Sequence, residues 1–518
     1  MVASFLTDAE LDPQDLSRPE VLLATLRSLR QAVQTEGQAT LQAWMPQIKR
    51  PEFLKSAENL AEYLALRRRD LRPLQTALMP WGLSSLGRIE GRVMANLNAV
   101  IATLEAVCHA DGASLSRPIL ESFFEGDRLL QANTEALFGK IPEHRRVSIM
   151  VTLPTEAATD ADFVRILLER GANCVRINCA HDTPVEWQAM IDHVRRATVE
   201  TGLSCKVYMD LGGPKPRTGE VVSLCDRKRV FVGDVIWLTE AAVDFESIMP
   251  TSLPTPLPAF QTCCSLPEIL SQLSPSDSVW IDDGKIGATV VTSCPTPDGK
   301  QGVLLRVAHT HPEGRKLKPD KGLNFPDTVL NLSPLTDKDY QDLDFAATRA
   351  DIIGYSFVQT AADIQQLQQA LQVRLNGAPL PAIVAKIETP EAIRNLPELI
   401  VQAAGQQILG VMIARGDLAV EIGYQRLAEM QEEILWICEA AHIPVIWATQ
   451  VLETLVKEGV PSRGEITDAA MAERAECVML NKGPFVAEAV SILDDVLTRM
   501  QAHQLKKTPQ LRALHSWL

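Results

Sequence analysis

From Val147 onward, short apolar runs alternate with amphipathic helical patterns, and this alternation constrains the fold more than any other feature of the sequence. We predict strands at 147–152, 174–178, 206–210, 351–356, 383–387, 408–414, 445–448 and 477–480. Helical patterns separate nearly all of them, for example at 160–170, 361–375, 390–404 and 427–441. Nearly continuous apolar strands that alternate with helices indicate a parallel sheet covered on both faces. Eight such units predict an α/β fold, a closed (β/α)8 TIM barrel.

One unit of the barrel is interrupted by a segment of different character. Between residues 219 and 320 the helical patterns give way to period-two stretches such as "RVFVGDVIWLTE", punctuated by Gly and Pro. Such stretches predict a small β-rich domain, inserted after the third barrel strand, that could close over the barrel mouth as a lid. The barrel then comprises residues 146–218 and 321–505, followed by a C-terminal tail at 506–518.

The region before the barrel, residues 1–145, is predicted to be all α-helical. Leu22, Leu26, Leu29 and Val33 form one apolar stripe at helical spacing. A second stripe follows the turn at 81–83 and comprises Val93, Leu97, Ile101, Leu104 and Cys108. Such stripes are usually packing surfaces, so we assign this region to packing or to assembly of a homo-oligomer, not to chemistry.

Composition excludes several classes of partner. The net charge of −15 argues against general binding to nucleic acid or to an anionic membrane, because both need a basic surface. No stretch approaches the roughly 18 apolar residues of a membrane span, and the N-terminus lacks the features of a signal peptide. The ten cysteines include no Cys-x-x-Cys pair. We therefore expect a soluble, cytoplasmic protein with reduced thiols.

Polar residues stand where the predicted strands end, which is where barrel enzymes place their chemistry. These residues are Asn178, Asp210, Ser356, Lys386, Glu388, Arg415, Asp417, Thr449, Asn481 and Lys482. Lys386 and Glu388 lie two apart on an extended segment, so their side chains share a face. They could be no more than a surface ion pair. With Asp417 after the next strand, however, Glu388 predicts a divalent-cation site of hard oxygen ligands.

The stretch from Val147 to Met500 resembles pyruvate kinase. The motifs that carry the resemblance are "VRINCAHD", "MDLGGPKPRTGE", "VWIDDGKIG", "KGLNFP", "AKIETPEAI", "IARGDLAVEIG", "ATQVLETL" and "SRGEITDAAMA", in the family's order and spacing. The resemblance implies phosphoryl transfer from phosphoenolpyruvate to ADP, giving pyruvate and ATP. It further implies that Glu388 and Asp417 bind Mg²⁺ or Mn²⁺, that Lys386 faces the transferring phosphoryl group, and that Arg176 and Arg217 bind phosphates.

Other roles follow from the same resemblance. The turn Arg415-Gly416-Asp417 matches the backbone that receives the substrate carboxylate. Thr449 matches the threonine associated with protonating enolpyruvate. His181, in the motif "VRINCAHD", falls on the nucleotide and cation side of the site.

The chain departs from the potassium-requiring members of the family. Those members hold potassium with an Asn, a Ser, an Asp and a Thr. Asn178 and Asp210 are retained here, but Ala180 replaces the Ser and Leu211 replaces the Thr. Lys215 stands where those members have Glu, and an ammonium group can supply the missing cation's charge. We expect K⁺ not to be required. In an alternative reading, the Gly and Pro residues beside Lys215 only mark the domain boundary.

Further departures keep two alternatives open. Gly212 replaces a family lysine, and the run Asn481-Lys482-Gly483-Pro484-Phe485 shortens the loop after the last strand. We also expect the family's C-terminal domain to be missing. The protein could be a phosphoenolpyruvate-binding phosphotransferase with a different acceptor. It could also be a non-catalytic metabolite sensor or scaffold whose helical region is the working part.

Overall fold

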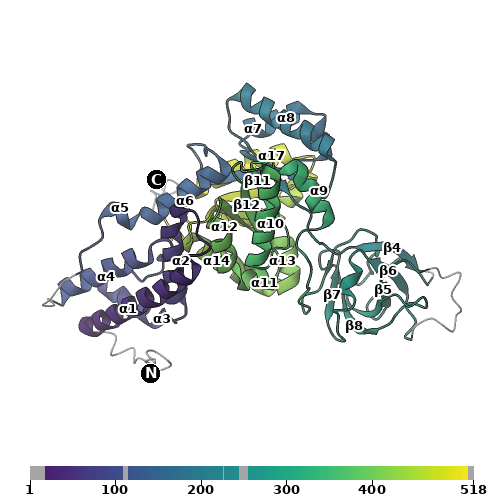
Figure 1. The fold of residues 1–518 in the computed structure, drawn as a ribbon, viewed down its shortest axis with the longest axis horizontal. Helices are drawn as coiled ribbons and strands as arrows, with labels where there is room; N and C mark the ends of the chain where they lie inside the picture. The colour runs from purple at the N-terminus through teal and green to yellow at the C-terminus, as the bar shows by residue number, and fades with distance from the viewer. Residues whose placement is uncertain (1–17, 109–114, 226, 244–254, 511–518) are drawn as a thin grey trace.

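The structure is a computed structural model that describes residues 18–108, 115–225, 227–243 and 255–510 (Figure 1). Its centre is a closed barrel of parallel strands in the order β1-β15-β14-β13-β12-β11-β3-β2. These strands are β1 (Ser148–Thr152), β2 (Cys174–Asn178), β3 (Lys206–Asp210), β11 (Ile352–Tyr355), β12 (Ala382–Ile387), β13 (Leu409–Ala414), β14 (Val445–Ala448) and β15 (Cys477–Leu480). The predicted barrel and its predicted strands are confirmed.

Helices connect the barrel strands and cover the outside of the barrel. They are α7 (Ala161–Glu169), α8 (Pro184–Thr201), α9 (Asp337–Ala346), α10 (Ala361–Leu375), α11 (Pro390–Arg394), α12 (Leu396–Ala404), α13 (Arg415–Ile422), α14 (Tyr424–Ala440), α15 (Glu453–Glu458), α16 (Arg463–Met471) and α17 (Val486–Met500). The single helix predicted at 390–404 is wrong, because the chain breaks at Asn395 into α11 and α12. Pro397 has no N–H to give to the carbonyl of Ile393, so it falls in the first turn of a new helix.

The insertion after β3 is a seven-stranded sheet with its own apolar core, set to one side of the barrel in Figure 1. The strand order is β10-β7-β8-β9-β5-β6-β4. The strands are β4 (Thr218–Ser223), β5 (Val235–Thr239), β6 (Phe260–Cys264), β7 (Ser278–Ile281), β8 (Ile286–Ser293), β9 (Gly302–His309) and β10 (Leu323–Asn324). We call this sheet the lid.

Two chain segments join the lid to the barrel, and they are hydrogen-bonded to each other. The amide of Leu323 donates to the carbonyl of Pro216 at 2.8 Å, and the amide of Thr218 donates to the carbonyl of Lys321 at 2.8 Å. The two segments therefore leave the barrel as one antiparallel ribbon.

The described part of the N-terminal region is helical, as predicted. It comprises α1 (Pro19–Trp44), α2 (Leu54–Arg67), α3 (Arg72–Leu78), α4 (Val93–Val107), α5 (Leu120–Phe123) and α6 (Glu125–Phe138), with a short 3₁₀ turn at Glu90–Arg92. The first predicted stripe, from Leu22 to Val33, is fully buried. The second is buried from Val93 to Leu104, but its last residue, Cys108, is only half-buried. Both stripes are internal packing surfaces in this chain.

The helical region packs against the floor of the barrel, the end at which the strands begin. Leu137 and Phe138, at the end of α6, are buried in one cluster with the inward-facing residues Met150, Tyr208 and Met412. These two side chains plug the floor, and α6 lies against the barrel in Figure 1.

After α17 the chain forms a short hairpin, β16 (Gln504–Leu505) and β17 (Thr508–Pro509), which spans the predicted boundary between the barrel and the tail at 506–518. Lys506 pairs with Glu476 and Lys507 pairs with Glu90, so the hairpin contacts both the barrel and the helical region. The rest of that segment, residues 511–518, lies outside the described residues. None of the described helices is long and apolar enough to cross a bilayer.

Candidate active site at the barrel mouth

A buried carboxylate, Asp210, lies at the centre of the barrel mouth. Its Oδ2 accepts hydrogen bonds from Nη2 and Nε of Arg176 at 2.6 and 2.8 Å, and its Oδ1 accepts one from the Tyr208 hydroxyl at 3.2 Å. Gly354 on the neighbouring strand leaves room for this arrangement, since a Cβ there would lie 2.1 Å from the Tyr208 hydroxyl. Burial alone would raise the pKa of Asp210, but Lys386 and Arg176 outweigh it and hold the pKa below its usual value.

Lys386 projects into the mouth from β12 and is held in place from three sides. Its Nζ donates to Ser356 Oγ at 2.6 Å and lies 3.4 Å from Asp210 Oδ2 and 3.2 Å from Glu388 Oε1. Burial would lower the pKa of Lys386, but Asp210 and Glu388 raise it. The ammonium group is therefore charged and fixed in direction.

Glu388 and Asp417, predicted as the metal ligands, stand close enough to influence each other's charge. Glu388 is 3% exposed and its Oε2 accepts a hydrogen bond from the Phe357 amide at 2.7 Å. The pKa of Glu388 is raised, first by burial and then by the charge of Asp417, against the effect of Lys386. A divalent cation would relieve this repulsion, so the pair fits such an ion.

The remaining ligands of such an ion would have to come from elsewhere. Among the residues that the structure describes, no three His, Cys, Asp or Glu side chains are grouped to hold a metal. Water or substrate oxygens would complete the shell, as is usual for Mg²⁺.

Lys215 lies on Asp417, not beside Asn178 and Asp210. Its Nζ donates to both carboxylate oxygens of Asp417, at 2.8 and 3.0 Å. Burial would raise the pKa of Asp417, and Lys215 outweighs burial and lowers it. Asn178 instead accepts a hydrogen bond from the Ala180 amide at 3.1 Å. The structure thus brings Lys215 to the carboxylate pair.

Two residues beside this ion pair were not singled out from the sequence. Asn324 of β10 donates to Glu421 at 2.8 Å and to Asp417 at 3.4 Å. Burial raises the pKa of Glu421 to about 7. A signal existed, because Glu421 follows Asp417 by one helical turn and so shares its face.

Thr449 occupies a strained turn at the end of β14. Its φ is +66°, a left-handed conformation that β-branched residues rarely adopt. Its Oγ1 is buried without a hydrogen-bond partner in the described part of the chain. A Cβ on Gly416 would lie 3.8 Å from that oxygen, so the Thr449 hydroxyl faces the first turn of α13. Backbone strain and an unsatisfied buried hydroxyl often occur together at functional sites, so Thr449 stays a candidate site residue.

Arg415 turns its side chain away from the mouth. Its guanidinium donates to Asp468 at 2.5 and 2.8 Å and to the carbonyl of Ala448 at 2.9 Å. Only its backbone, with that of Gly416 and Asp417, begins α13 at the edge of the mouth. Backbone N–H groups in such a first turn favour an anion.

Basic residues gather on the opposite side of the mouth, around His181. Burial lowers the pKa of His181, and the charges of Lys482, Arg217 and Arg176 lower it further. Arg217 is half-exposed and pairs with Asp320 Oδ1 at 3.3 Å. Lys482 is exposed. This side of the mouth carries positive charge suited to phosphate groups.

Comparison with known proteins agrees with this geometry. Residues 144–490 match the family described as pyruvate kinase, barrel domain. The chain is 31% identical over 368 residues to a pyruvate kinase of Methylorubrum extorquens, which covers 70% of this chain and 70% of that protein. It is 30% identical over 372 residues to a pyruvate kinase of Agrobacterium vitis, and the match covers 70% of this chain and 71% of that protein. For a pyruvate kinase of Dictyostelium discoideum the identity is 29% over 355 residues, which cover 67% of this chain and 65% of that protein. The chain therefore belongs to the pyruvate kinase family.

Proposed function

We propose that this protein transfers the phosphoryl group of phosphoenolpyruvate to ADP, giving pyruvate and ATP. The observation that carries this proposal is the position of Lys386, which is charged, buried and directed into the mouth by Ser356, Asp210 and Glu388. A fixed positive charge there would stabilise the charge that develops on the phosphoryl group and on the enolate oxygen.

The neighbouring residues supply the rest of the chemistry. Glu388 and Asp417 would hold Mg²⁺ or Mn²⁺, whose charge would neutralise phosphoryl oxygens. The backbone of Gly416 and Asp417 would receive the substrate carboxylate. Arg176 and Arg217, on the side of the mouth around His181, would bind phosphate groups.

The second half of the reaction needs a proton at the methylene carbon of enolpyruvate. Thr449 has a buried hydroxyl that no described group engages. We assign this hydroxyl to the transfer of that proton, which converts enolpyruvate to pyruvate.

The test is turnover of phosphoenolpyruvate with ADP and magnesium, coupled to lactate dehydrogenase, beside the variant Lys386→Met. Loss of the fixed charge should lower kcat by about 10²- to 10³-fold. Lys457→Met is the matched control, because Lys457 is exposed on α15, far along the chain from Lys386, and pairs with Glu453. Full turnover in Lys386→Met would contradict the assignment, as would an inactive parent chain that still binds phosphoenolpyruvate.

We further propose that K⁺ is not required, because Lys215 supplies a fixed positive charge beside the carboxylate pair. Turnover should be unchanged when potassium is replaced by a bulky organic cation. Lys215→Gln should lower kcat/KM by about tenfold, since a charged hydrogen bond is worth about 1.5–3 kcal/mol. A rate that rises steeply with potassium in the parent chain would contradict this role.

One observation favours a different acceptor as a second candidate. Only Asn481–Phe485 separates β15 from α17, so the loop on the phosphate side of the mouth is short. A panel of nucleoside diphosphates, with ATP formation measured directly, distinguishes the candidates. Pyruvate formation that is faster with another acceptor than with ADP would favour the second.

A further inference from the structure

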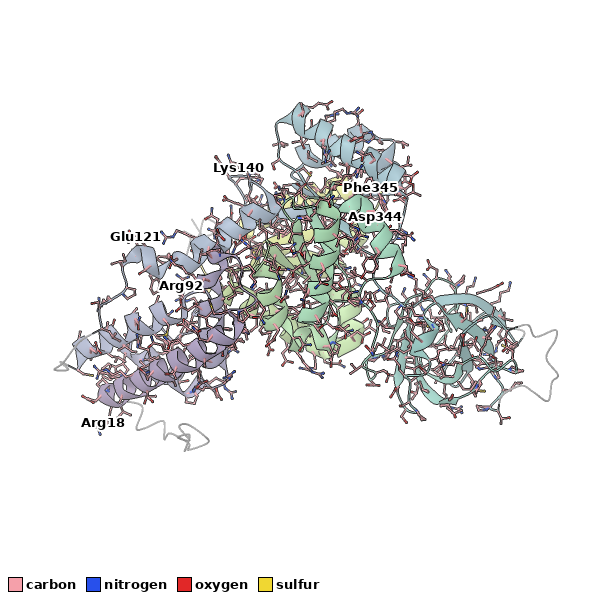
Figure 2. All side chains as sticks on the ribbon, viewed as in Figure 1. Arg18, Arg92, Glu121, Lys140, Asp344 and Phe345 are labelled. Atoms are coloured by element: carbon pink, nitrogen blue, oxygen red, sulfur yellow. The ribbon has the colours of Figure 1, made fainter. Side chains whose placement is uncertain are left out.

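A cavity of about 440 Å³ lies at the floor of the barrel, the end opposite the mouth. It is enclosed by α6, the segment that leads from α6 to β1, the end of α14, the start of β15 and the C-terminal hairpin. Figure 2 labels Lys140, where the chain leaves α6 and begins to follow the cavity toward β1. Its volume is in the range of small-molecule sites, about 300–1,000 Å³.

Several charged groups at this cavity already have partners. Asp127 pairs with Arg92 at 3.0 Å. Glu476 pairs with Lys506 and accepts a hydrogen bond from the Val445 amide at 2.8 Å. These groups hold the surrounding elements together and need no ligand.

Two carboxyl groups at the cavity are different. Glu473 is 5% exposed, and its Oε2 has no hydrogen-bond partner in the part of the chain that the structure describes. Glu439 is half-buried, and its side chain makes no hydrogen bond or ion pair with any described residue. A buried oxygen without a partner is unfavourable, so Oε2 of Glu473 indicates a missing donor at this cavity, and Glu439 adds a second carboxyl group to its lining.

The basic residues nearby leave these carboxyl groups unsatisfied. Arg145 is turned away, donating to the carbonyl of Gly171 at 2.8 Å and lying 3.3 Å from Asp494. Arg146 is exposed and forms no ion pair with Glu473 in the described structure. Acidic side chains therefore outnumber basic ones in the lining, where Asp127, Glu135, Glu143, Glu439, Glu473 and Glu476 face Arg145, Arg146 and Lys506.

We propose that this cavity binds a small organic cation, whose ammonium or guanidinium group donates hydrogen bonds to Glu473 and Glu439. Such a group provides several donors and a positive charge, which suits two carboxyl groups that line one cavity without hydrogen-bond partners of their own. Because the ligand would touch α6, the barrel and the C-terminal hairpin, it would join the three parts of the chain that meet there.

The raised pKa values of Glu473 and Glu439 are consistent with a site that gains a cation when it is occupied. Burial, with a contribution from Glu476, raises the pKa of Glu473 to about 8, against Arg146, Arg145 and Lys506. A bound cation favours the ionised carboxyl, so its binding should release protons near neutral pH. The heat of binding would then depend on the ionisation enthalpy of the buffer.

The experiment is isothermal titration of the full chain with putrescine, agmatine and spermidine at up to millimolar concentration. At least one should bind saturably, with proton release seen as a buffer-dependent heat. Glu473→Gln should weaken binding about tenfold or more, since it removes a charged hydrogen-bond partner. Glu433→Gln is the matched control, because Glu433 lies exposed on the same helix as Glu439.

Two results would overturn the site. The first is that none of the three cations binds saturably, or that Glu473→Gln and Glu439→Gln bind a cation as strongly as the parent chain does. The other is binding of inorganic phosphate in their place, lost in Arg146→Gln, which would make the cavity an anion site. Because binding is measured directly, the outcome does not depend on whether the mouth turns over phosphoenolpyruvate.

Discussion

At the scale of single residues, the mouth of the barrel is a set of buried charges that neutralise one another. Arg176 and Lys386 meet Asp210, and Lys215 meets Asp417. Buried charges are tolerated only when they are paired in this way. Removing one partner leaves the other charge buried with a desolvation cost that no attraction offsets. The same pairing holds each side chain in one direction before a substrate arrives.

Sequence position identified most of these residues but not their partners. A strand end can be located in the sequence where an apolar run stops. Asp210 and Lys386 stand at such positions, so they could be predicted as site residues. The partner of Lys215 could not be found in this way, because it depends on how the ribbon carrying Lys215 crosses the mouth. Its contact with Asp417 is set by the tertiary structure alone.

Thr449 offers a test at this scale. Thr449→Val removes the buried hydroxyl while keeping the shape, so kcat should fall about 10²-fold with little change in KM for phosphoenolpyruvate. Exchange of the pyruvate methyl protons in D₂O, followed by NMR, should slow by a similar factor. Thr449→Ser keeps the hydroxyl and should restore most of both rates. Unchanged exchange in Thr449→Val would remove Thr449 from the proton transfer.

At the scale of elements, the barrel strands were predictable because each is buried on both faces and therefore reads as a continuous apolar run. For example, β13 has the sequence "LGVMIA" and is buried at every position. The lid was predictable only as β-rich. Its strand order joins distant segments, such as β4 with β6 and β10 with β7, and period-two patterns carry no information about which strands pair.

Gly126 on α6 offers a test at this scale. A Cβ there would lie 1.9 Å from the carbonyl oxygen of Gly91 and 2.6 Å from Nε2 of His442. Gly126→Ala should therefore force α6 away from the 3₁₀ turn at Glu90–Arg92 and lower the free energy of unfolding by about 3 kcal/mol. Urea denaturation followed by circular dichroism measures the loss.

The control for this prediction is Gly464→Ala on α16. Gly464 is exposed, and its Cβ would approach only Ser462 Oγ, at 3.9 Å. This variant should be as stable as the parent chain or slightly more so, because Ala favours a helix over Gly by up to about 1 kcal/mol. Equal stability of Gly126→Ala and the parent chain would show that α6 and the turn do not pack as described.

At the scale of the whole molecule, the helical region is part of the barrel's own core. Asn59 of α2 donates to the carbonyl of Ala440 at 2.8 Å, and Ser56 hydrogen-bonds His442 at 2.9 Å. Leu137 and Phe138 complete the floor. We therefore expect the helical region and the barrel to unfold in one transition.

Phe138→Ala tests this coupling. Removing a fully buried aromatic side chain should cost about 3–5 kcal/mol, and the loss should appear in the unfolding of the barrel, not only of α6. Unfolding in urea should be followed by far-UV circular dichroism and by tryptophan fluorescence, to which Trp447 of β14 and Trp44 of α1 both contribute. Phe124→Ala is the control, because Phe124 is 42% exposed. Separate transitions for the two signals would contradict a shared core.

The ribbon that joins lid and barrel has a mechanical consequence. Two hydrogen-bonded strands bend readily across their flat face but resist sliding past each other, because sliding breaks the hydrogen bonds that Leu323 donates to Pro216 and Thr218 donates to Lys321. We therefore expect the lid to swing along one arc more readily than in other directions. The contact of Lys215 with Asp417 lies at the barrel end of that arc, so each swing toward the mouth returns the ammonium group to the same carboxylate.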